Sequence, residues 1–343
     1  MAITTGELVF SKVQEGVEVT PGTGVTCTAA LNMEVGSSPD LDRAPEAPQE
    51  DYGVISSRQP GRAYYGVRLM KHSMKGVVRF EDVMRFLEAG LAGGVSPTVP
   101  VATAYLWAYA ADDTTDTLKS RTLKFGDNIN QYSSTYCLVE KIHLYYDALA
   151  SGSNAPWRID VDYIGQDLQN STFDSVSNVA SAETPMGHLT KIYFGSTATA
   201  FGSLSEITGS LVKFDMTIET GVTTRKWGGT TDTFDSHGRL NRKVTFTGTV
   251  FATTAGKTIF RDPWVTANSS AIMEKRMRIK SVGGLITGST YKELTIDNRA
   301  HINAVKIAEN NGAAVYEIEG AAVDDSTLSS DIKISVQNGV ASL

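Results

Sequence analysis

The chain has few of the residues that build disulfide frameworks, thiolate metal sites or membrane spans. Only two cysteines, Cys27 and Cys137, occur among its 343 residues, and neither belongs to a CxxC or Cys/His spacing. We expect both thiols to be buried and reduced. No apolar run of about 18 residues is present, and residues 1–7 lack the basic and apolar regions of a secretory signal. The sequence therefore predicts no membrane-spanning segment.

Basic residues are outnumbered by acidic ones. The chain has 31 Lys and Arg against 38 Asp and Glu, which gives a formal net charge of −7. A protein that grips nucleic acid by its phosphates carries a basic stripe or face, and here the densest basic cluster is the short segment 275–278. We therefore expect DNA near this protein to be repelled and not held.

Motifs for catalysis or cofactor binding are also lacking. Residues 255–258 imitate the end of a phosphate-binding P-loop, but Phe251 stands where the first glycine of that motif is required. None of the five histidines stands beside a serine or cysteine in a nucleophile motif. The sequence predicts that the protein is not an enzyme and needs no cofactor.

Three acidic segments resemble metal sites only superficially. Segments 112–116 and 324–325 lack the spacing, glycine and glutamate of a calcium loop, so their carboxylates are expected in solvated turns. In segment 232–237, Asp232, Asp235 and His237 share one loop, a composition that favours a structural role over a metal site. No metal site is predicted.

The main positive feature of the sequence is the alternation of polar and apolar residues. Short runs of alternating polar and apolar residues recur with turn signals between them, which predicts a mainly β fold. A hydrophobic content of 41% and a charged content of 20% are globular values, and the length suggests about two domains. Helical periodicity is clear only in 79–91, where Phe80, Val83, Met84, Leu87 and Leu91 share one face. A weaker helical segment, 257–264, is limited by Pro263.

The order of these elements occurs twice. Each half opens with a strand (25–33 and 211–219), continues through a long loop (35–62 and 220–240) and a further strand, and reaches its helix. Four strands follow, matched as 103–109 with 276–282, 121–125 with 291–296, 137–145 with 301–307, and 157–163 with 315–319. The predicted organisation is a first β lobe over 1–168, a linker and connecting segment over 169–207, and a second β lobe over 208–343. The alternative is that any all-β chain of this length yields strands at similar spacing.

The residue pattern of three predicted strands indicates that each has an apolar face and an acidic face. In 158–163 the apolar side chains alternate with Asp160 and Asp162, and the same alternation sets Glu317 and Glu319, and Asp215 and Glu219, opposite apolar residues. Two interpretations remain open. The acidic face is either the solvent side of a β-sandwich or the wall of a channel for a polyanion.

The chain resembles the tail tube proteins of siphophages, the phages with long non-contractile tails. The resemblance rests on the order strand, long loop, strand, short helix, strands, on segments 122–144 and 157–167, and on 209–219 and 242–251 in the second half. It implies two similar tail-tube-type β-sandwich lobes, each with one short flanking α-helix. It also implies that sheets of neighbouring subunits join into a β-barrel ring and that rings stack through the long loops and terminal segments.

The resemblance implies a structural protein of a bacteriophage tail, assembled in the host cytoplasm and located in the virion. Its rings would form the hollow tube through which double-stranded DNA passes without specific binding, and its partners would be other copies of itself, a tape measure protein and tail-end proteins. Most members carry one lobe and form six-chain rings, so two lobes favour three chains per ring, with six as the alternative. The competing interpretation is an adhesin or baseplate-type protein that binds a carbohydrate or receptor.

Two sets of site residues follow. The lumen is expected to be lined by Asp160, Asp162, Glu317, Glu319, Asp215 and Glu219. Contacts within or between rings are expected from the two long loops, since exposed aromatics and charges there suggest surfaces that await a partner. These residues are Asp40, Asp42, Arg43, Glu50 and Asp51 in the first loop and Trp227 and Phe234 in the second.

Overall fold

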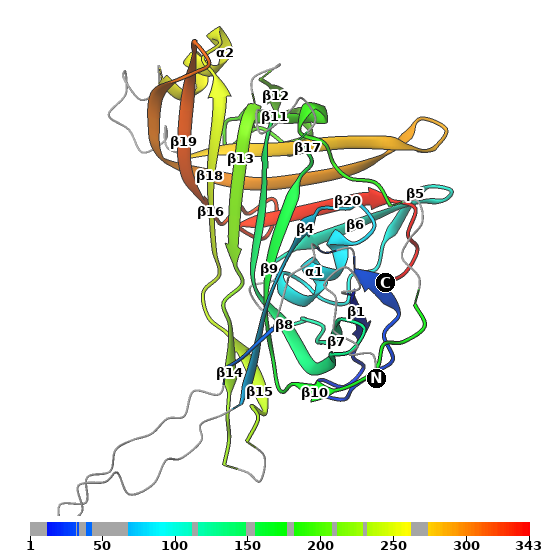
Figure 1. Cartoon of the computed structure of the whole chain (residues 1–343). Helices are drawn as coiled ribbons and strands as arrows, with labels where there is room; N and C mark the ends of the chain where they lie inside the picture. The colour runs from blue at the N-terminus through cyan, green and yellow to red at the C-terminus, as the bar shows by residue number, and fades with distance from the viewer. Residues whose placement is uncertain are drawn as a thin grey trace, which may run out of the picture.

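The structure, a computed structural model, is mainly β, as predicted, with two short α-helices among the residues it describes (Figure 1). It describes residues 12–31, 33, 39–42, 68–111, 116–148, 155–176, 182–207, 211–228, 232–261 and 274–343. Its strands form a two-stranded sheet and one continuous 18-stranded sheet, in which we distinguish a long antiparallel sheet and two shorter sheets that cross it. Most of the buried apolar residues that the structure describes form one cluster between these layers.

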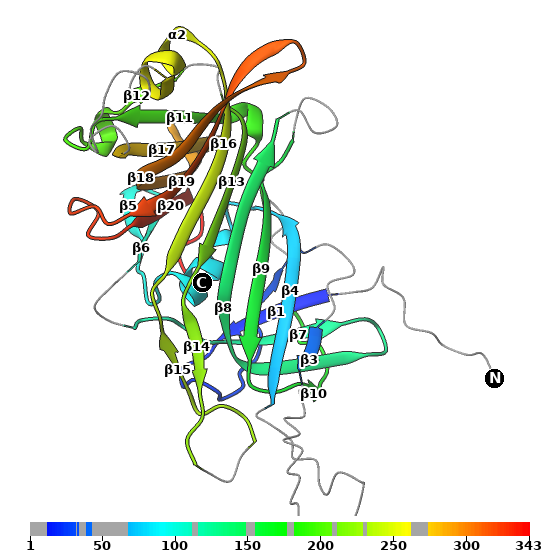
Figure 2. The ribbon, with the colours of Figure 1, turned by 90° about the vertical axis from the view of Figure 1, so that its left-hand side faces the viewer.

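The long sheet contains eight strands that run side by side in both halves of the sequence (Figure 2). Their order across the sheet is β3 (Pro39–Asp42), β4 (Leu69–Val77), β9 (Arg158–Gly165), β8 (Gln131–Asp147), β13 (Leu211–Glu219), β16 (Lys243–Phe251), β19 (Ala313–Val323) and the C-terminal part of β18 (Thr290–Asn310). The two halves meet where β8 pairs with β13, so they share one continuous sheet.

Strands β8 and β18 each belong to two sheets because each contains a bulge and bends. The N-terminal part of β18 lies in an upper crossing sheet, ordered β12 (Ser205–Glu206), β11 (Thr190–Gly195), β17 (Glu274–Thr287), β18, β20 (Ile332–Asn338), β6 (Ala104–Ala110) and β5 (Thr98–Val101). The N-terminal part of β8 lies in a lower crossing sheet, ordered β2 (Ala29–Leu31), β1 (Lys12–Val17), β7 (Arg121–Gly126), β8 and β10 (Gln169–Asn170).

Alternation within the long sheet produces its buried face. In β9, Ile159, Val161 and Tyr163 are buried, while the residues between them reach solvent, and β13 and β16 follow the same rule. Trp157 and Phe214 pack together within this core, with ring centroids 6.1 Å apart. The alternation read from the sequence is therefore the side-chain pattern of a sheet that buries one face.

The helix predicted over 79–91 is present as α1 (Val83–Gly90), and all of its residues are buried. It packs so closely on β8 that a Cβ at Gly90 would lie 2.9 Å from the Cβ of Val139, which explains why only glycine fits there. The weaker helical segment is present over its described part as α2 (Thr254–Gly256) followed by the π-helical turn η4 (Lys257–Arg261). Phe260 of this turn packs edge-on against Phe194, with ring centroids 5.0 Å apart.

Charged residues are buried beneath α1 in opposite-sign pairs. Arg121 on β7 is fully buried and contacts Glu88 of the helix, while Arg85 of the helix contacts Glu15 on β1 at 3.0 Å. Removing one partner of such a pair would leave an uncompensated charge in the core. The helix is therefore held to β1 and β7 by specific ion pairs as well as by apolar packing.

Three details of the predicted organisation are corrected. Segment 169–207 is not simply a linker, because it contains β11 and β12, and β11 pairs with β17 over six residues. Segments 103–109 and 276–282, matched in the predicted order, differ in their neighbours, because β6 pairs with β5 and β20, whereas β17 pairs with β11 and β18. Segment 220–240 forms a hairpin of β14 (Val222–Arg225) and β15 (Ser236–Arg239) where a loop was expected.

Candidate functional site

The solvent-facing side of the long sheet, which we call the outer face, brings together all six predicted lumen residues. Asp160 and Asp162 lie on β9, Asp215 and Glu219 on β13, and Glu317 and Glu319 on β19. Residues directly opposite each other in a ladder point to the same side of the sheet, and the registers from β9 through β8, β13 and β16 to β19 give these carboxylates the same orientation. The six residues therefore lie on one face of the long sheet.

The outer face is not uniformly acidic, however. Seven carboxylates whose side chains are described, Asp147, Asp160, Asp162, Asp215, Glu219, Glu317 and Glu319, share it with seven cationic residues, Lys71, Lys75, Lys141, Arg158, Lys213, Lys243 and Lys306. An acidic face was expected from the residues of three strands alone, and the neighbouring strands supply most of the compensating cations.

Most of these cations stand directly opposite a carboxylate. Lys75 pairs in register with Asp160, Lys141 lies between Asp162 and Glu219, and Lys306 is opposite Glu317. The ammonium group of Lys306 also lies 3.1 Å from Glu319. Opposite charges in such cross-strand positions stabilise the sheet modestly, and they leave no run of unopposed positive charge along these strands.

His143 connects two of the predicted carboxylates at the junction of the two halves. Its Nε2 lies 3.0 Å from Asp215 on β13 and its Nδ1 lies 3.5 Å from Asp160 on β9. The ring stacks on Tyr145, with centroids 4.6 Å apart. A polar side chain on β8 thus bridges the strands on either side of it.

Phe234, predicted to await a partner, is buried within the chain itself. It packs in a small second core with Leu118, Tyr136, Leu138, Ile164 and Val222, and its ring lies 5.0 Å from that of Tyr136. Gln166 donates a hydrogen bond of 2.7 Å from Nε2 to the Phe234 carbonyl. The prediction for Phe234 was wrong because the partner of this aromatic is a strand from the other half of the sequence.

The three loop residues that share segment 232–237 point to three different partners. Asp232 pairs with Arg68, Asp235 accepts hydrogen bonds from Lys226 and from the Trp227 backbone N–H, and His237 lies between Asp116 and the Tyr136 hydroxyl. The hydrogen bond from His237 lowers the pKa of Asp116. The contacts of Asp232 and His237 link this segment to the first half of the chain, whereas those of Asp235 lie within segment 226–235.

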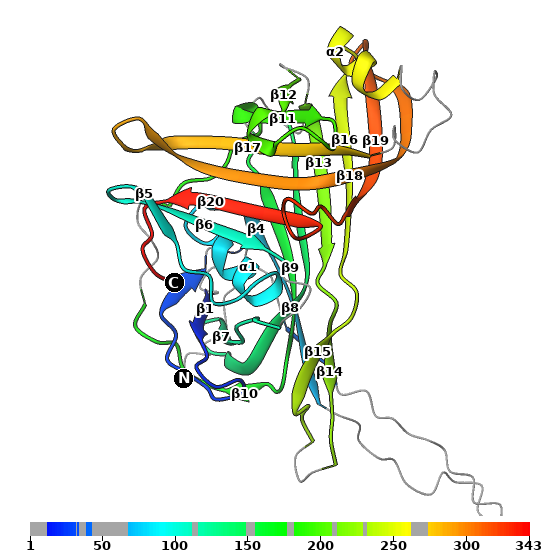
Figure 3. The same ribbon diagram turned by 180° about the vertical axis from the view of Figure 1, so that it is seen from behind.

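Trp227 is the exposed aromatic that the sequence predicts. It follows β14 and is 59% exposed, although its backbone is held by the 2.7 Å hydrogen bond to Asp235. The hairpin extends from the end of the long sheet, on the side away from α2 (Figures 1 and 3). The indole is thus presented on a projecting hairpin segment that is linked to the first half of the chain through Asp232 and His237.

The remaining predicted contact residues belong to the first long loop. Asp40 and Asp42 lie on β3, whose backbone pairs with β4 through Asp40 opposite Lys71 and Asp42 opposite Leu69. Arg43, Glu50 and Asp51 lie outside the described residues.

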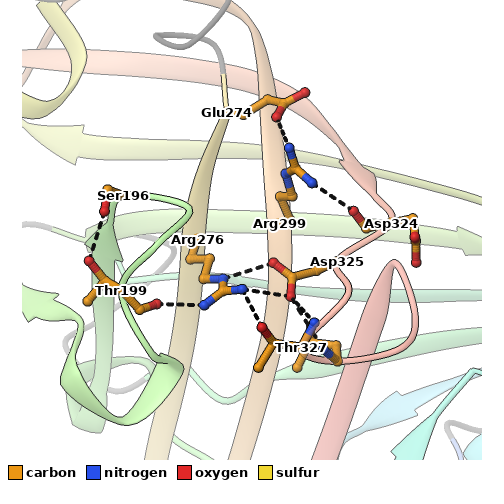
Figure 4. Close-up of polar contacts among 9 residues, drawn as sticks. Ser196, Thr199, Glu274, Arg276, Arg299, Asp324, Asp325 and Thr327 are labelled. Carbon is orange, nitrogen blue, oxygen red and sulfur yellow. Dashed lines mark hydrogen bonds and ion pairs between the residues drawn. The ribbon is translucent and has the colours of Figure 1, made fainter.

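A buried ion pair near the bend of β18 was missed. Arg276 donates to both carboxylate oxygens of Asp325 at 2.8 and 2.9 Å and to the Thr199 carbonyl at 2.9 Å (Figure 4). Burial raises the pKa of Asp325, but the hydrogen bonds from Arg276 and the Thr327 N–H outweigh it and hold that pKa below its ordinary value. Asp325 was expected in a solvated turn. Its role in the buried ion pair depends on Arg276, which is distant in the sequence.

Within the described part of the chain, no group of three or more His, Cys, Asp or Glu residues is arranged to hold a metal ion. The helices found there are too short or too polar to cross a bilayer.

A scan against protein-family models gives no match, and neither does a search of curated proteins.

Proposed function

We propose that this protein is a structural subunit of a siphophage tail, which polymerises into stacked rings and forms the hollow tube through which the viral DNA passes. One observation carries the proposal. The long sheet consists of two four-strand units of the same order, β3-β4-β9-β8 and β13-β16-β19-β18, placed side by side. Because equivalent four-strand units follow one another across the sheet, further copies of the chain can extend the sheet in the same direction.

The proposal includes a duplicated lobe. Strand pairings in one half have counterparts in the other: β1–β7 and β11–β17, β1–β2 and β11–β12, β4–β9 and β16–β19, β8–β9 and β18–β19, β8–β10 and β18–β20. A helix follows the equivalent strands β4 and β16. Because one chain then supplies two units, three chains give a ring of six units, and a ring of six chains is the alternative.

The size of such a ring is compatible with a DNA duplex. Three chains with eight strands each would give a barrel of 24 strands. At a strand spacing of about 4.8 Å and a tilt of about 35–45°, the barrel would measure about 45–50 Å between backbones. The outer face would line the lumen, because the opposite face is covered by the core, the crossing sheets and α1.

The lumen would be a wall of paired charges. A row of unopposed lysines would release counterions from DNA, bind its phosphates and slow its passage. On the outer face Lys75, Lys141 and Lys306 each stand opposite a carboxylate, so their charges are offset locally. Asp160, Asp162, Glu317, Glu319, Asp215 and Glu219, expected from the sequence to form a negative wall, remain lumen-lining residues in the proposal, which now has them share the wall with these lysines.

The β14–β15 hairpin is proposed to connect stacked rings, with Trp227 as its anchor. The hairpin projects along the strand direction of the long sheet, which would be the direction of the next ring. Large aromatic side chains often contribute much of the binding energy of an interface. A tape measure protein and tail-end proteins would be the other partners in the virion.

The proposal is tested by whether the purified protein assembles when it is concentrated. The purified protein should pellet at high speed in a concentration-dependent manner and appear as hollow cylinders by negative-stain electron microscopy. A protein that stays a discrete oligomer and is retained by a glycan array would instead be an adhesin or baseplate-type module, and the tube would be ruled out.

A further inference from the structure

Four polar side chains from three different sheets meet in the core beneath α1. Glu15 on β1 and Arg121 on β7 come from the lower crossing sheet, Tyr163 on β9 from the long sheet, and Tyr109 on β6 from the upper crossing sheet. None of the four residues is more than 1% exposed. Helix α1 lies between the two crossing sheets (Figure 1). We call these four residues the junction cluster.

The charged groups of the junction cluster are only partly paired. Arg121 contacts Glu88 of α1 through Nη2 and donates from the same atom to the Arg85 carbonyl at 3.3 Å. Glu15 accepts a hydrogen bond of 3.0 Å from Arg85 through Oε1. The other polar atoms of the two side chains, Nε and Nη1 of Arg121 and Oε2 of Glu15, are buried and have no hydrogen-bond partner among the described residues.

Arg121 and Glu15 face each other across a distance longer than a hydrogen bond. Nη1 of Arg121 lies 4.0 Å from Oε1 of Glu15, whereas an N–H···O hydrogen bond spans about 2.7–3.2 Å. A water molecule beside two such groups can accept from the guanidinium and donate to the carboxylate. The ion pair therefore has the spacing and the unused atoms of a water-mediated contact.

Two phenol hydroxyls complete the junction cluster. Those of Tyr109 and Tyr163 are buried and have no hydrogen-bond partner within the described ranges. Burial raises the pKa of both phenols, Glu88 adds to the effect at Tyr109 and Glu15 at Tyr163, and the charge of Arg121 opposes it at both. Both hydroxyls thus lie within electrostatic reach of Arg121. Buried hydroxyls are rarely left unsatisfied in native cores, because the loss of their hydration is unfavourable.

We infer that the junction cluster is a binding site for buried water, which hydrogen-bonds Arg121, Glu15 and the two phenol hydroxyls to one another. The five unpartnered atoms comprise two N–H donors, one carboxylate acceptor and two hydroxyls that can do either. Because a buried water makes about three hydrogen bonds, about two water molecules can satisfy them. The inference does not depend on the proposed function.

Charge favours water over an anion at this site. The buried cations Arg85 and Arg121 are already matched by Glu15 and Glu88. An added anion would leave a net negative charge in the core, which is strongly unfavourable, and it could not donate a hydrogen bond to Oε2 of Glu15. Water donates to that oxygen and accepts from Arg121, so it suits both.

The water is a structural ligand at the junction of the three sheets. It connects side chains of β6, β9, β1 and β7 that make no direct hydrogen bond to one another in the described structure. A buried polar network is favourable only when all of its members are satisfied. Bound water therefore explains how the core accommodates a fully buried arginine and carboxylate beside two phenols.

Tyrosine-to-phenylalanine variants test the site in dilute protein, because they remove one hydroxyl and keep the ring. If water binds these hydroxyls, Tyr109→Phe and Tyr163→Phe should each raise the equilibrium constant for urea unfolding about fivefold. The double variant should raise it by less than the product of the two single effects, because the hydroxyls share water. If each substitution instead lowers the constant, the hydroxyls had no partner and the inference is wrong.

Tyr146→Phe is the matched control. Its hydroxyl is also buried and unpartnered within the described structure, but it lies away from the junction cluster: burial raises its pKa, and Asp147 is the charge that acts on it. A water at this hydroxyl would lack the about two to four polar partners that it needs, so the unfolding constant should stay the same or fall. A fivefold rise in all three variants would attribute the effect to the rings and overturn the inference.

A high-resolution crystal structure of the intact chain shows the ligand directly. We expect density peaks within hydrogen-bonding distance of Arg121 Nη1, of Glu15 Oε2 and of at least one of the two phenol hydroxyls. Crystals grown in bromide distinguish water from an anion, since an anomalous peak at this position would identify an anion and refute the assignment to water. A direct hydrogen bond between Arg121 and Glu15 without any such density would refute it as well.

Discussion

The most quantitative prediction concerns Asp82, the residue before helix α1. It is buried, and its side chain makes no capping hydrogen bond to the helix. Burial raises its pKa from the ordinary value of 3.8 to about 6, although Arg85 and Arg79 act in the opposite direction. The folded protein therefore binds a proton between about pH 4 and pH 6 that the unfolded chain has already released. Stability falls as the pH rises through this window.

The magnitude follows from the size of the shift. A difference of roughly two pKa units at about 1.4 kcal/mol each corresponds to about 3 kcal/mol of destabilisation at pH 7. Asp82→Asn removes the ionisation and keeps the shape of the side chain. We expect the variant to be about 3 kcal/mol more stable than the unchanged protein at pH 7 and nearly equal to it at pH 4.

Urea unfolding of dilute protein at a series of pH values measures this difference. Asp127→Asn is a control of opposite sign, because hydrogen bonds from the Asn130 and Ile129 N–H groups lower the pKa of Asp127. That variant should lose stability at pH 7 and not at low pH. If Asp82→Asn and the unchanged protein have parallel stability curves from pH 4 to pH 7, the carboxyl is not destabilised by burial and the reasoning is refuted.

Three further predictions address the ion pair, the hairpin and the lumen. Arg276→Ala leaves Asp325 buried without its partner and should cost about 3–5 kcal/mol in urea unfolding; a cost below about 1 kcal/mol would show that the pair is dispensable. Trp227→Ala should leave the unfolding midpoint unchanged, since the indole is largely exposed, yet shorten the polymers seen by electron microscopy, and polymers of normal length would remove the anchor role. Replacing Asp160 and Asp162 by Lys leaves the opposite lysines uncompensated, so tubes should still form but retain DNA in a salt-dependent way; DNA passage at the normal rate would contradict the account of the lumen.

Features that depend on neighbouring residues in the sequence were predicted well. The 3.6-residue spacing of Val83, Met84 and Leu87 locates α1, because a helix is a local structure. Alternation along β9 and β13 identifies which side chains are buried, because the period of a strand is also local. The mainly β fold follows from these two periods.

Features that depend on pairing between distant segments could not be predicted. Phe234 is buried by Tyr136 and Ile164, which are far from it in the sequence, and Asp325 is neutralised by Arg276 on another strand. The charge of the outer face depends on which strands are neighbours, and bulges in β8 and β18 decide the register. No single strand carries that information.

The central claim is that two equivalent units in each chain build one hollow tube. A helical reconstruction of the concentrated protein by cryo-electron microscopy tests it most directly. The account predicts a continuous barrel of 24 strands with three chains of 36.9 kDa per ring and the outer face toward the lumen. Six chains per ring would contradict the stoichiometry, and a particle without a lumen, or with the outer face turned away from it, would contradict the claim itself.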